Sequence, residues 1–274
     1  MKRGHRRLSS ILSTWPSVIL IASIPFLLMG VISMPRSKEP KLKKDGIVNI
    51  DLLVKKVTRL NKEKKHEQAI KMLMTALEGE DSDSLLRPLL LQSFDMFLGE
   101  QIETGEKEIR NHPKNTDAYI RVANSLELLD NKDRAMEILV HGVSINPDNA
   151  AVWMQIGKLE HKAGREMEAL DVFKEVIRQN PKNADAFNNA AFVLAKSNKS
   201  TEKDLKEAED FAKNARKLDP KNPEYLDTYA ELLFRSGNSK MAQSLIKEAI
   251  KLAPDREFFK HQLKRFSEST STTK

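Results

Sequence analysis

The chain is 274 residues long and contains no cysteine, which excludes disulfide frameworks, thiolate zinc sites and cysteine nucleophiles. Its net charge of +7 is carried by residues 1–49, which hold nine Lys or Arg and two Asp or Glu, whereas the remaining 225 residues hold 37 of each sign. A nucleic-acid-binding domain normally shows a basic excess. The balanced charge of residues 50–274 therefore argues against nucleic acid as a partner.

An uncharged segment follows the basic N-terminus. Residues 15–34 contain 14 apolar side chains in 20, and about 20 apolar residues are needed for a helix to cross a bilayer. We therefore predict a transmembrane helix or signal anchor at 15–34, after a basic tail at 1–14 and before a linker at 35–49. The alternative is a cleaved signal peptide, which would make the chain a secreted protein.

The charges that flank this segment leave its orientation in the membrane undecided. Four Lys or Arg precede it and five follow within ten residues, so the positive-inside rule does not decide between the two orientations. A short basic N-terminus favours its own retention in the cytoplasm. We therefore predict a single-pass protein of the inner (cytoplasmic) membrane, with residues 50–274 on the extracytoplasmic side. The reversed orientation stays open.

Residues 50–115 show the apolar spacing of amphipathic helices. A first helical hairpin is indicated by apolar residues on both of its helices, namely Leu53, Val57, Leu60, Ala69, Leu73 and Ala76. A second and weaker hairpin is predicted within residues 82–113.

Five prolines then recur at a nearly fixed interval: Pro113, Pro147, Pro181, Pro220 and Pro254. Their gaps are 34, 34, 39 and 34 residues. A period in this range indicates a repeat architecture in which each repeat is one helical hairpin. Proline suits such a junction because it lacks an amide donor and pushes the preceding residue out of helical geometry.

Between the prolines, each unit repeats one order of bulky and small residues. In the unit that ends at Pro181 this order is Trp153, Ile156, Gly157, Ala169, Phe173 and Val176. The pattern resembles the tetratricopeptide repeat (TPR) family. The resemblance implies an all-α fold, a right-handed superhelical solenoid of helix-turn-helix hairpins behind the N-terminal transmembrane helix. It places four TPR units in 116–256 and two degenerate TPR-like units in 50–115.

Local signals support the helical hairpins. Small residues would let the second helix of each hairpin approach the first, and they are Ala123, Gly157, Ala191 and Ala230. Asp and Asn residues follow the prolines and are predicted to supply oxygen caps for the next helix, namely Asp148, Asn149, Asn183 and Asp185. Gly164 and Gly237 are predicted to end their helices in the left-handed conformation.

The 39-residue gap and the C-terminus complete the predicted array. Five extra residues fall in the polar stretch 196–204, which we place in the turn of the third unit, where an insertion costs least. Residues 257–266 space apolar side chains on one face and predict a capping helix, as arrays require at their ends. Residues 267–274 are predicted to be a disordered tail.

No catalytic or metal-binding pattern is present in the sequence. The six histidines lie in different units without an i, i+4 pair, and there is no glycine-rich phosphate loop, nucleophile elbow or pair of catalytic carboxylates. We therefore expect a protein that is not an enzyme and that needs no cofactor and no metal.

The resemblance implies that the first helix of each hairpin lines a concave groove that receives a protein or peptide. Carried over position by position, the candidate groove residues are Ile120, Asn124, Glu127, Met154, Lys158, His161, Lys162, Asn188, Phe192, Lys196, Asp227, Glu231 and Arg235. The basic residues cluster in the middle and the acidic ones toward the end, which suits a partner of mixed charge. Phe192 stands out because an aromatic side chain in a groove-facing position has no role in the core.

These observations predict a membrane-anchored bacterial-type TPR scaffold that binds protein partners through its concave face, in envelope complex assembly or biogenesis. One alternative is an adaptor on the cytoplasmic or an organelle surface that recruits soluble proteins to a membrane. A secreted TPR protein after signal cleavage is another, and self-association into a homo-oligomer is a further possibility.

Overall fold

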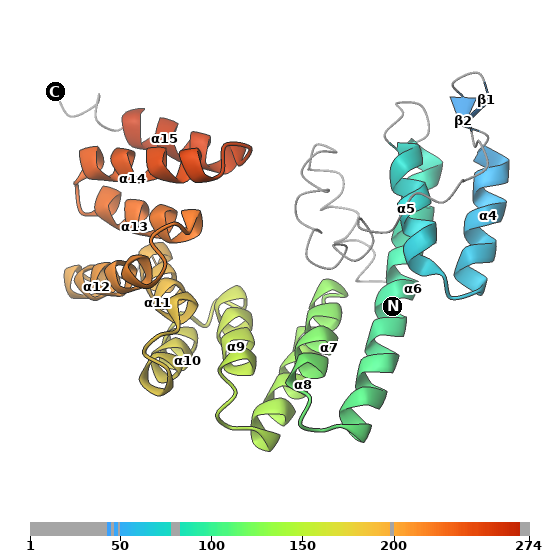
Figure 1. The fold of residues 1–274 in the computed structure, drawn as a ribbon, viewed down its shortest axis with the longest axis horizontal. Helices are drawn as coiled ribbons and strands as arrows, with labels where there is room; N and C mark the ends of the chain where they lie inside the picture. Colours follow the sequence, from blue (N-terminus) through green and yellow to red (C-terminus); the bar gives the residue numbers. More distant parts are fainter. Residues whose placement is uncertain (1–42, 45–46, 49, 78–82, 198–199, 269–274) are drawn as a thin grey trace. The chain divides into compact units, whose positions relative to one another are not determined.

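The part of the chain that the structure describes is almost entirely helical, in agreement with the predicted all-α class (Figure 1). The computed structural model describes residues 43–44, 47–48, 50–77, 83–197 and 200–268. A pair of two-residue antiparallel strands, β1 (Lys43–Lys44) and β2 (Ile47–Val48), precedes the helices. The helices are α4 (Ile50–Lys62), α5 (His66–Leu77), α6 (Asp83–Asn111), α7 (Thr116–Leu128), α8 (Lys132–Ile145), α9 (Ala150–Lys162), α10 (Glu166–Gln179), α11 (Ala184–Lys196), α12 (Glu202–Leu218), α13 (Pro223–Arg235), α14 (Ser239–Leu252) and α15 (Glu257–Glu268).

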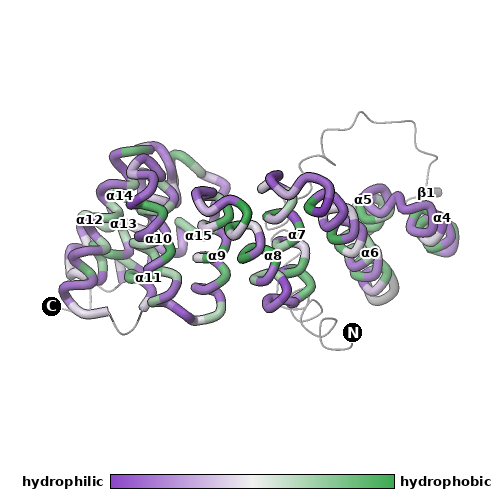
Figure 2. Tube along the Cα trace, turned by 90° about the horizontal axis from the view of Figure 1, so that it is seen from below, coloured by the Kyte–Doolittle hydropathy of each residue, from purple (hydrophilic) through white to green (hydrophobic). Residues whose placement is uncertain are grey.

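The helices form two compact units. The N-terminal unit contains the described residues up to Asn111 together with Arg121–Ala135, and the C-terminal unit contains His112–Ile120 and the described residues from Met136 onward. Each unit has its own hydrophobic core. In both, the helices carry hydrophobic and hydrophilic residues side by side (Figure 2), as expected for helices that bury one face.

In the N-terminal unit, α5 and α6 are in contact, and α4 packs against both. Fully buried apolar side chains at helical spacing hold the three helices together, and these are Leu53, Val57, Ala69, Ile70, Leu73 and Leu86. The first hairpin predicted from the sequence is therefore present as α4 and α5.

The second predicted hairpin of this region is not formed. Helix α6 instead runs without interruption for 29 residues, from Asp83 to Asn111. The sequence holds no strong turn signal inside it: Pro88 lies near its start, and the isolated Gly99 is tolerated in a helix whose apolar face is packed. Residues 50–115 thus contain one hairpin and one long helix rather than two hairpins.

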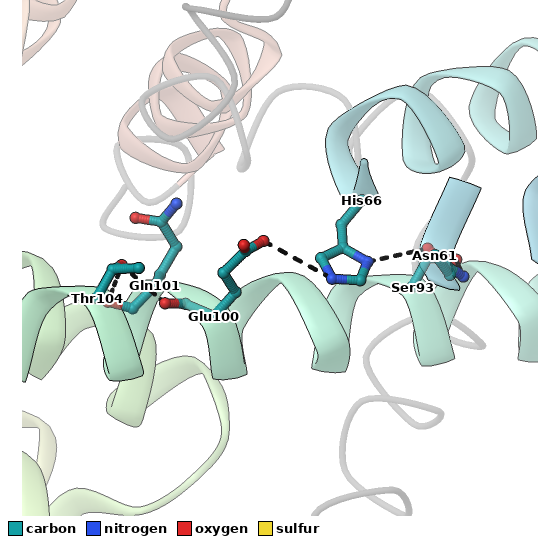
Figure 3. A network of polar contacts seen from close by, with 6 residues as sticks. All are labelled: Asn61, His66, Ser93, Glu100, Gln101 and Thr104. Carbon is teal, nitrogen blue, oxygen red and sulfur yellow. Dashed lines mark hydrogen bonds and ion pairs between the residues drawn. The ribbon is translucent and has the colours of Figure 1, made fainter. Parts of the chain in front are cut away.

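A buried polar network locks these three helices together (Figure 3). The Ser93 hydroxyl donates to the carbonyl of Leu89 at 2.9 Å, so its oxygen is free to accept from Asn61 Nδ2 at 2.8 Å. Asn61 Oδ1 then faces His66 Nδ1 at 3.1 Å, which places a proton on Nδ1. His66 Nε2 lies 3.7 Å from the carboxylate of Glu100. The network therefore joins one side chain of α4 and one of α5 to two side chains of α6.

In the C-terminal unit, helical hairpins stack in chain order (Figure 1). Contacts join α9 to α10, α11 to α12 and α13 to α14 within hairpins, and α10 to α11 and α12 to α13 between them. Helix α15 packs on α14 and buries Phe259 and Phe266 completely. This last helix closes the hydrophobic core with its apolar face, as a capping helix does.

The helix ends follow the local signals in the sequence. Asn149 accepts a hydrogen bond from the Val152 amide at 2.9 Å, and Asn183 accepts one from Ala186 at 3.0 Å. Gly164 and Gly237 have φ values of 78° and 80°, in the left-handed region that glycine adopts without a steric penalty. Of the predicted cap residues, the two asparagines are confirmed as N-caps, and both predicted C-terminal glycines are confirmed.

The insertion in the third unit is shared between a loop and a helix. Helix α12 has 17 residues, whereas α8, α10 and α14 each have 14. It begins at Glu202, after Thr201, which forms a capping box with Asp204. The sequence pattern predicts all five extra residues in the turn, but the capping box starts the helix early, so three of them lengthen α12.

The predicted localisation has to be corrected. No helix within residues 50–77, 83–197 and 200–268 is long and apolar enough to cross a bilayer. Only α6 exceeds 17 residues among them, and its second half carries Glu100, Glu103 and Glu106. The structure thus contradicts a single-pass protein of the inner membrane. Segment 15–34, on which that prediction rested, lies outside the described residues, as do the tail at 1–14 and residues 269–274.

Replacing Asn61 with alanine is predicted to destabilise the N-terminal unit. The change leaves the buried Nδ1–H of His66 without an acceptor, which costs about 1–3 kcal/mol of unfolding free energy. Urea unfolding followed by circular dichroism measures the effect. Thr58→Ala on the exposed side of α4, where Thr58 bonds only the Val54 carbonyl, is the control. An Asn61→Ala protein as stable as the control would contradict the role of the network.

Gly157→Ala is predicted to destabilise the C-terminal unit, and Gly99→Ala to stabilise the chain. A Cβ on Gly157 would lie 2.5 Å from the Phe173 ring, whereas one on Gly99 would meet nothing within 4 Å. Overpacking of this kind costs about 1–3 kcal/mol. Alanine in an exposed helix interior adds about 0.5–1 kcal/mol relative to glycine. Midpoints of urea unfolding that move in the same direction for both variants would refute the packing argument.

Candidate protein-binding face

The first helices of the hairpins lie next to one another in the C-terminal unit. Helix α11 contacts α9 on one side and α13 on the other. Residues three or four positions apart on such helices share a face. This spacing groups ten of the candidate residues, and we call the side of the helices that they share the odd-helix face: Met154, Lys158, His161 and Lys162 on α9, Asn188, Phe192 and Lys196 on α11, and Asp227, Glu231 and Arg235 on α13. Met154 is only 7% exposed and packs in the hydrophobic core, so a partner cannot reach it.

The three candidates on α7 stand apart from this group. Ile120 belongs to the C-terminal unit, whereas Asn124 and Glu127 belong to the N-terminal unit. All three are half-buried. Their membership of a common site with the odd-helix face stays a prediction.

Phe192 lies at the centre of a small cluster on this face. The His161 ring meets it edge-on, with centroids 5.5 Å apart and planes at 80°. Lys196 places its ammonium 5.7 Å from the ring centroid, within the range of a cation–π contact. Phe192 itself is half-buried, so the cluster joins α9 to α11 and still presents part of an aromatic ring to the surface.

Two polar atoms beside Phe192 have no hydrogen-bond partner. These atoms, His161 Nδ1 and Asn188 Oδ1, are buried and unpaired within the part of the chain that the structure describes. Most buried polar groups in proteins are paired, and an unpaired one costs about 1–3 kcal/mol. Asn188 lies one turn before Phe192 on α11, so both unpaired atoms belong to side chains at the centre of the face.

The acidic end of the face is covered by the last helix. Asp227 and Glu231 are only 8% and 7% exposed. Gln262 of α15 donates to Asp227 Oδ1 at 3.3 Å, and Arg265 of α15 forms an ion pair with Glu231. The guanidinium of Arg265 also stacks on Phe266, 4.8 Å from its ring centroid. These two carboxylates therefore hold α15 in place.

Arg235 has a structural contact of its own. Its guanidinium donates to the carbonyls of Leu194, Ala195 and Ser197, at the C-terminal end of α11. The last carbonyls of a helix lack partners inside the helix and attract positive charge. Arg235 thus ties α13 to the end of α11.

Burial raises the pKa of Asp227 to about 6, against the opposing effect of the hydrogen bond from Gln262. Neighbouring Glu224 raises this pKa further, and Lys196 lowers it. Contacts therefore join His161, Phe192 and Lys196 at one end of the face, and Asp227 and α15 at the other.

The sequence pattern located the Phe192 cluster, because Phe192, His161 and Lys196 were all candidates and the structure brings them together. It missed Gln262 and Arg265, which occupy the acidic end. The polar residues of 257–266 lie opposite the apolar stripe of this predicted helix. They were a signal that the helix has a second, polar side on which contacts could form. Only the docking of α15 shows that they face Asp227 and Glu231.

Comparisons with known proteins agree with this architecture. Residues 116–149 match the family model described as a tetratricopeptide repeat. The chain is 25% identical over 143 residues to TPR repeat-containing protein PA4667 of Pseudomonas aeruginosa, covering 52% of this chain and 24% of that protein. It is 26% identical over 98 residues to the uncharacterized protein y4yS of Sinorhizobium fredii, covering 36% of this chain and 54% of that one. The aligned regions thus span about a quarter and about half of these relatives.

Among solved structures, the fold is similar to that of TTC0263, a thermophilic TPR protein of Thermus thermophilus. The TM-score is 0.51 and the sequence identity 21%, over 66% of this chain and 94% of that one. The similarity shows a shared fold over about two thirds of this chain.

Asp227→Asn is predicted to stabilise the C-terminal unit above pH 6. The pKa of Asp227 in the folded chain, about 6, lies above the ordinary value of 3.8. The stability contributed by its protonated form is therefore complete below pH 4 and is lost as the pH rises through 6. The loss is about 3 kcal/mol, and asparagine, which stays neutral and can still accept from Gln262, avoids it.

The measurement is urea unfolding at pH values from 4 to 8. The stability of Asp227→Asn relative to the unmodified chain should grow between pH 4 and 6.5 and then level off. Asp171→Asn on the exposed side of α10 controls for the loss of one charge and should change stability by less than about 0.5 kcal/mol. A pH-independent difference for Asp227→Asn would contradict the burial of an ionised carboxylate.

Proposed function

We propose that this protein is a non-enzymatic scaffold that binds a protein partner, as a peptide segment, on the odd-helix face of its C-terminal unit. The observation that carries the proposal is the Phe192 cluster: a half-buried aromatic ring flanked by His161 and Lys196 on a surface built from helices. Aromatic residues in such surroundings dominate the binding energy of protein interfaces. The TPR architecture supports the proposal, because the resemblance implies peptide binding by the first helices of the repeats.

The polar atoms around Phe192 suit the backbone of a bound peptide. Asn188 Oδ1 is an acceptor for a peptide N–H, and His161 Nδ1 can donate or accept according to its tautomer. Both side chains are only half-buried, so a rotation about χ2 can turn these atoms toward a ligand. A peptide that pairs them would remove a cost that the free protein carries.

The rigidity of the face favours binding as well. Its residues project from helices whose opposite sides are packed in one continuous core, which contains Ala190, Ala191 and Val193 of α11 with 0–2% exposure. A site on packed helices loses little conformational entropy when a ligand binds. The odd-helix face therefore offers a partner a surface that is already ordered.

Site-specific photocrosslinking tests the proposal. A benzophenone amino acid in place of Phe192 should crosslink a partner in native extract, whereas the same group in place of Met167, which is 65% exposed on α10, should not. The captured protein is then purified, and its affinity is measured by calorimetry with the unmodified chain.

Phe192→Ala should weaken that affinity at least tenfold, as expected for the removal of a buried aromatic anchor, and Met167→Ala should leave it unchanged. Equal crosslinking from both positions would place the binding site elsewhere, and so would an affinity that is unchanged by Phe192→Ala.

A further inference from the structure

We propose that the segment bound by the odd-helix face is acidic, with carboxylates that pair with Lys158 and Lys196 on either side of an apolar side chain seated on Phe192. The proposal rests on the function proposed above and specifies the chemistry of the partner. Three observations carry it: the sign of the charges that remain unpaired, their position around Phe192, and the charge of the segments of this chain that could compete for the face.

The carboxylates of the face are already in use. Asp227 is hydrogen bonded to Gln262, and Glu231 is paired with Arg265, and both are buried under α15. A basic partner would have to displace this helix, which is anchored by the fully buried Phe259 and Phe266. The mixed charge expected from the sequence is therefore not what the folded face presents.

Most cations on the face and on the neighbouring α15, Lys162 included, already interact with other groups of the protein. Arg235 caps the end of α11, and Arg265 neutralises Glu231. Lys158 and Lys196 are exposed and form no ion pair within the described part of the chain. The charge offered to a partner is therefore positive, and it comes from one lysine on α9 and one on α11.

One lysine lies over the aromatic ring, and the other is a helical neighbour of the histidine that contacts the ring. Lys196 lies over the face of Phe192. Lys158 precedes His161 by three residues on α9, so their side chains are neighbours on the helix surface, and His161 touches Phe192. A peptide that places an apolar residue on the ring can thus direct acidic residues at both lysines. An exposed ion pair changes affinity by about fivefold at most, so the carboxylates set the preference while the ring supplies the anchor.

The two ends of the chain lack the acidic character expected of the occupant. Residues 1–49 hold nine basic and two acidic residues, the same sign as the face, and residues 269–274 hold one lysine and no acid. Both segments would be repelled by Lys158 and Lys196. An acidic segment of a different protein fits the face better than either end of this chain.

Selection from a display library of random 12-residue peptides tests the charge preference on the full chain. Peptides retained by the unmodified chain and lost with Phe192→Ser define the binders of the face. Three charge variants are compared: the unmodified chain, the double variant Lys158→Glu with Lys196→Glu, and a matched control, Lys247→Glu with Lys251→Glu. Both control residues are exposed lysines of α14.

The unmodified chain and the α14 control should enrich peptides that combine several Asp or Glu with an apolar residue. The Lys158→Glu and Lys196→Glu variant should bind these peptides at least tenfold more weakly in fluorescence anisotropy and should enrich basic peptides instead. Raising the salt concentration from 50 to 500 mM should lower the affinity for the acidic peptides and leave the affinity for neutral peptides nearly unchanged.

Two results would overturn the inference and can be told apart. Peptides whose binding depends on Phe192 but that carry no acidic excess would contradict the charge preference and remain consistent with the proposed function. If no peptide binds in a way that depends on Phe192, both the charge preference and the proposed function are contradicted. Light scattering that shows a dimer for the unmodified chain and a monomer for Phe192→Glu would likewise overturn the inference, in favour of a second copy as the occupant.

Discussion

The close approach of paired helices is the constraint on which the array depends. At Gly157, the ring of Phe173 occupies the space in which a side chain would begin, and full burial of Ala190 and Ala230 marks the same requirement in the next two hairpins. Dispersion forces fall off steeply with distance, so helices that approach closely pack at crystal-like density. The rigid stack that results holds α9, α11 and α13 side by side, and thereby fixes the positions of Phe192 and its neighbours.

Charge then decides which part of this surface is left for a partner. Helix α15 ends the array with buried phenylalanines. Its Gln262 and Arg265 also bind the carboxylates at the acidic end of the odd-helix face. A carboxylate such as Asp227 is costly to bury and is tolerated because it is hydrogen bonded. The same helix that closes the hydrophobic core therefore leaves the lysines around Phe192 as the charges that a ligand meets.

Local rules predicted much of this fold, and tertiary contacts account for the rest. Helix caps at Asn149 and left-handed turns at Gly164 depend on a few adjacent residues, so the sequence alone was sufficient. The continuity of α6 was missed because a hairpin was expected there although no turn signal was present. The burial of Asp227 under α15 depends on how that helix docks, and the early start of α12 depends on its capping box. The proline period contains neither piece of information. For the candidate site, the pattern found the Phe192 cluster but not the residues of α15 that limit it.

Hydrogen–deuterium exchange with and without a bound acidic peptide tests the central claim most directly, because it reports which helices a ligand touches. The account predicts slower exchange at the amides of α9 and α11, around His161 and Phe192, with α10 and α12 unchanged at their exposed ends. Protection confined to α10, α12 or α14, or to the N-terminal unit, would contradict the assignment of the binding surface to the odd-helix face.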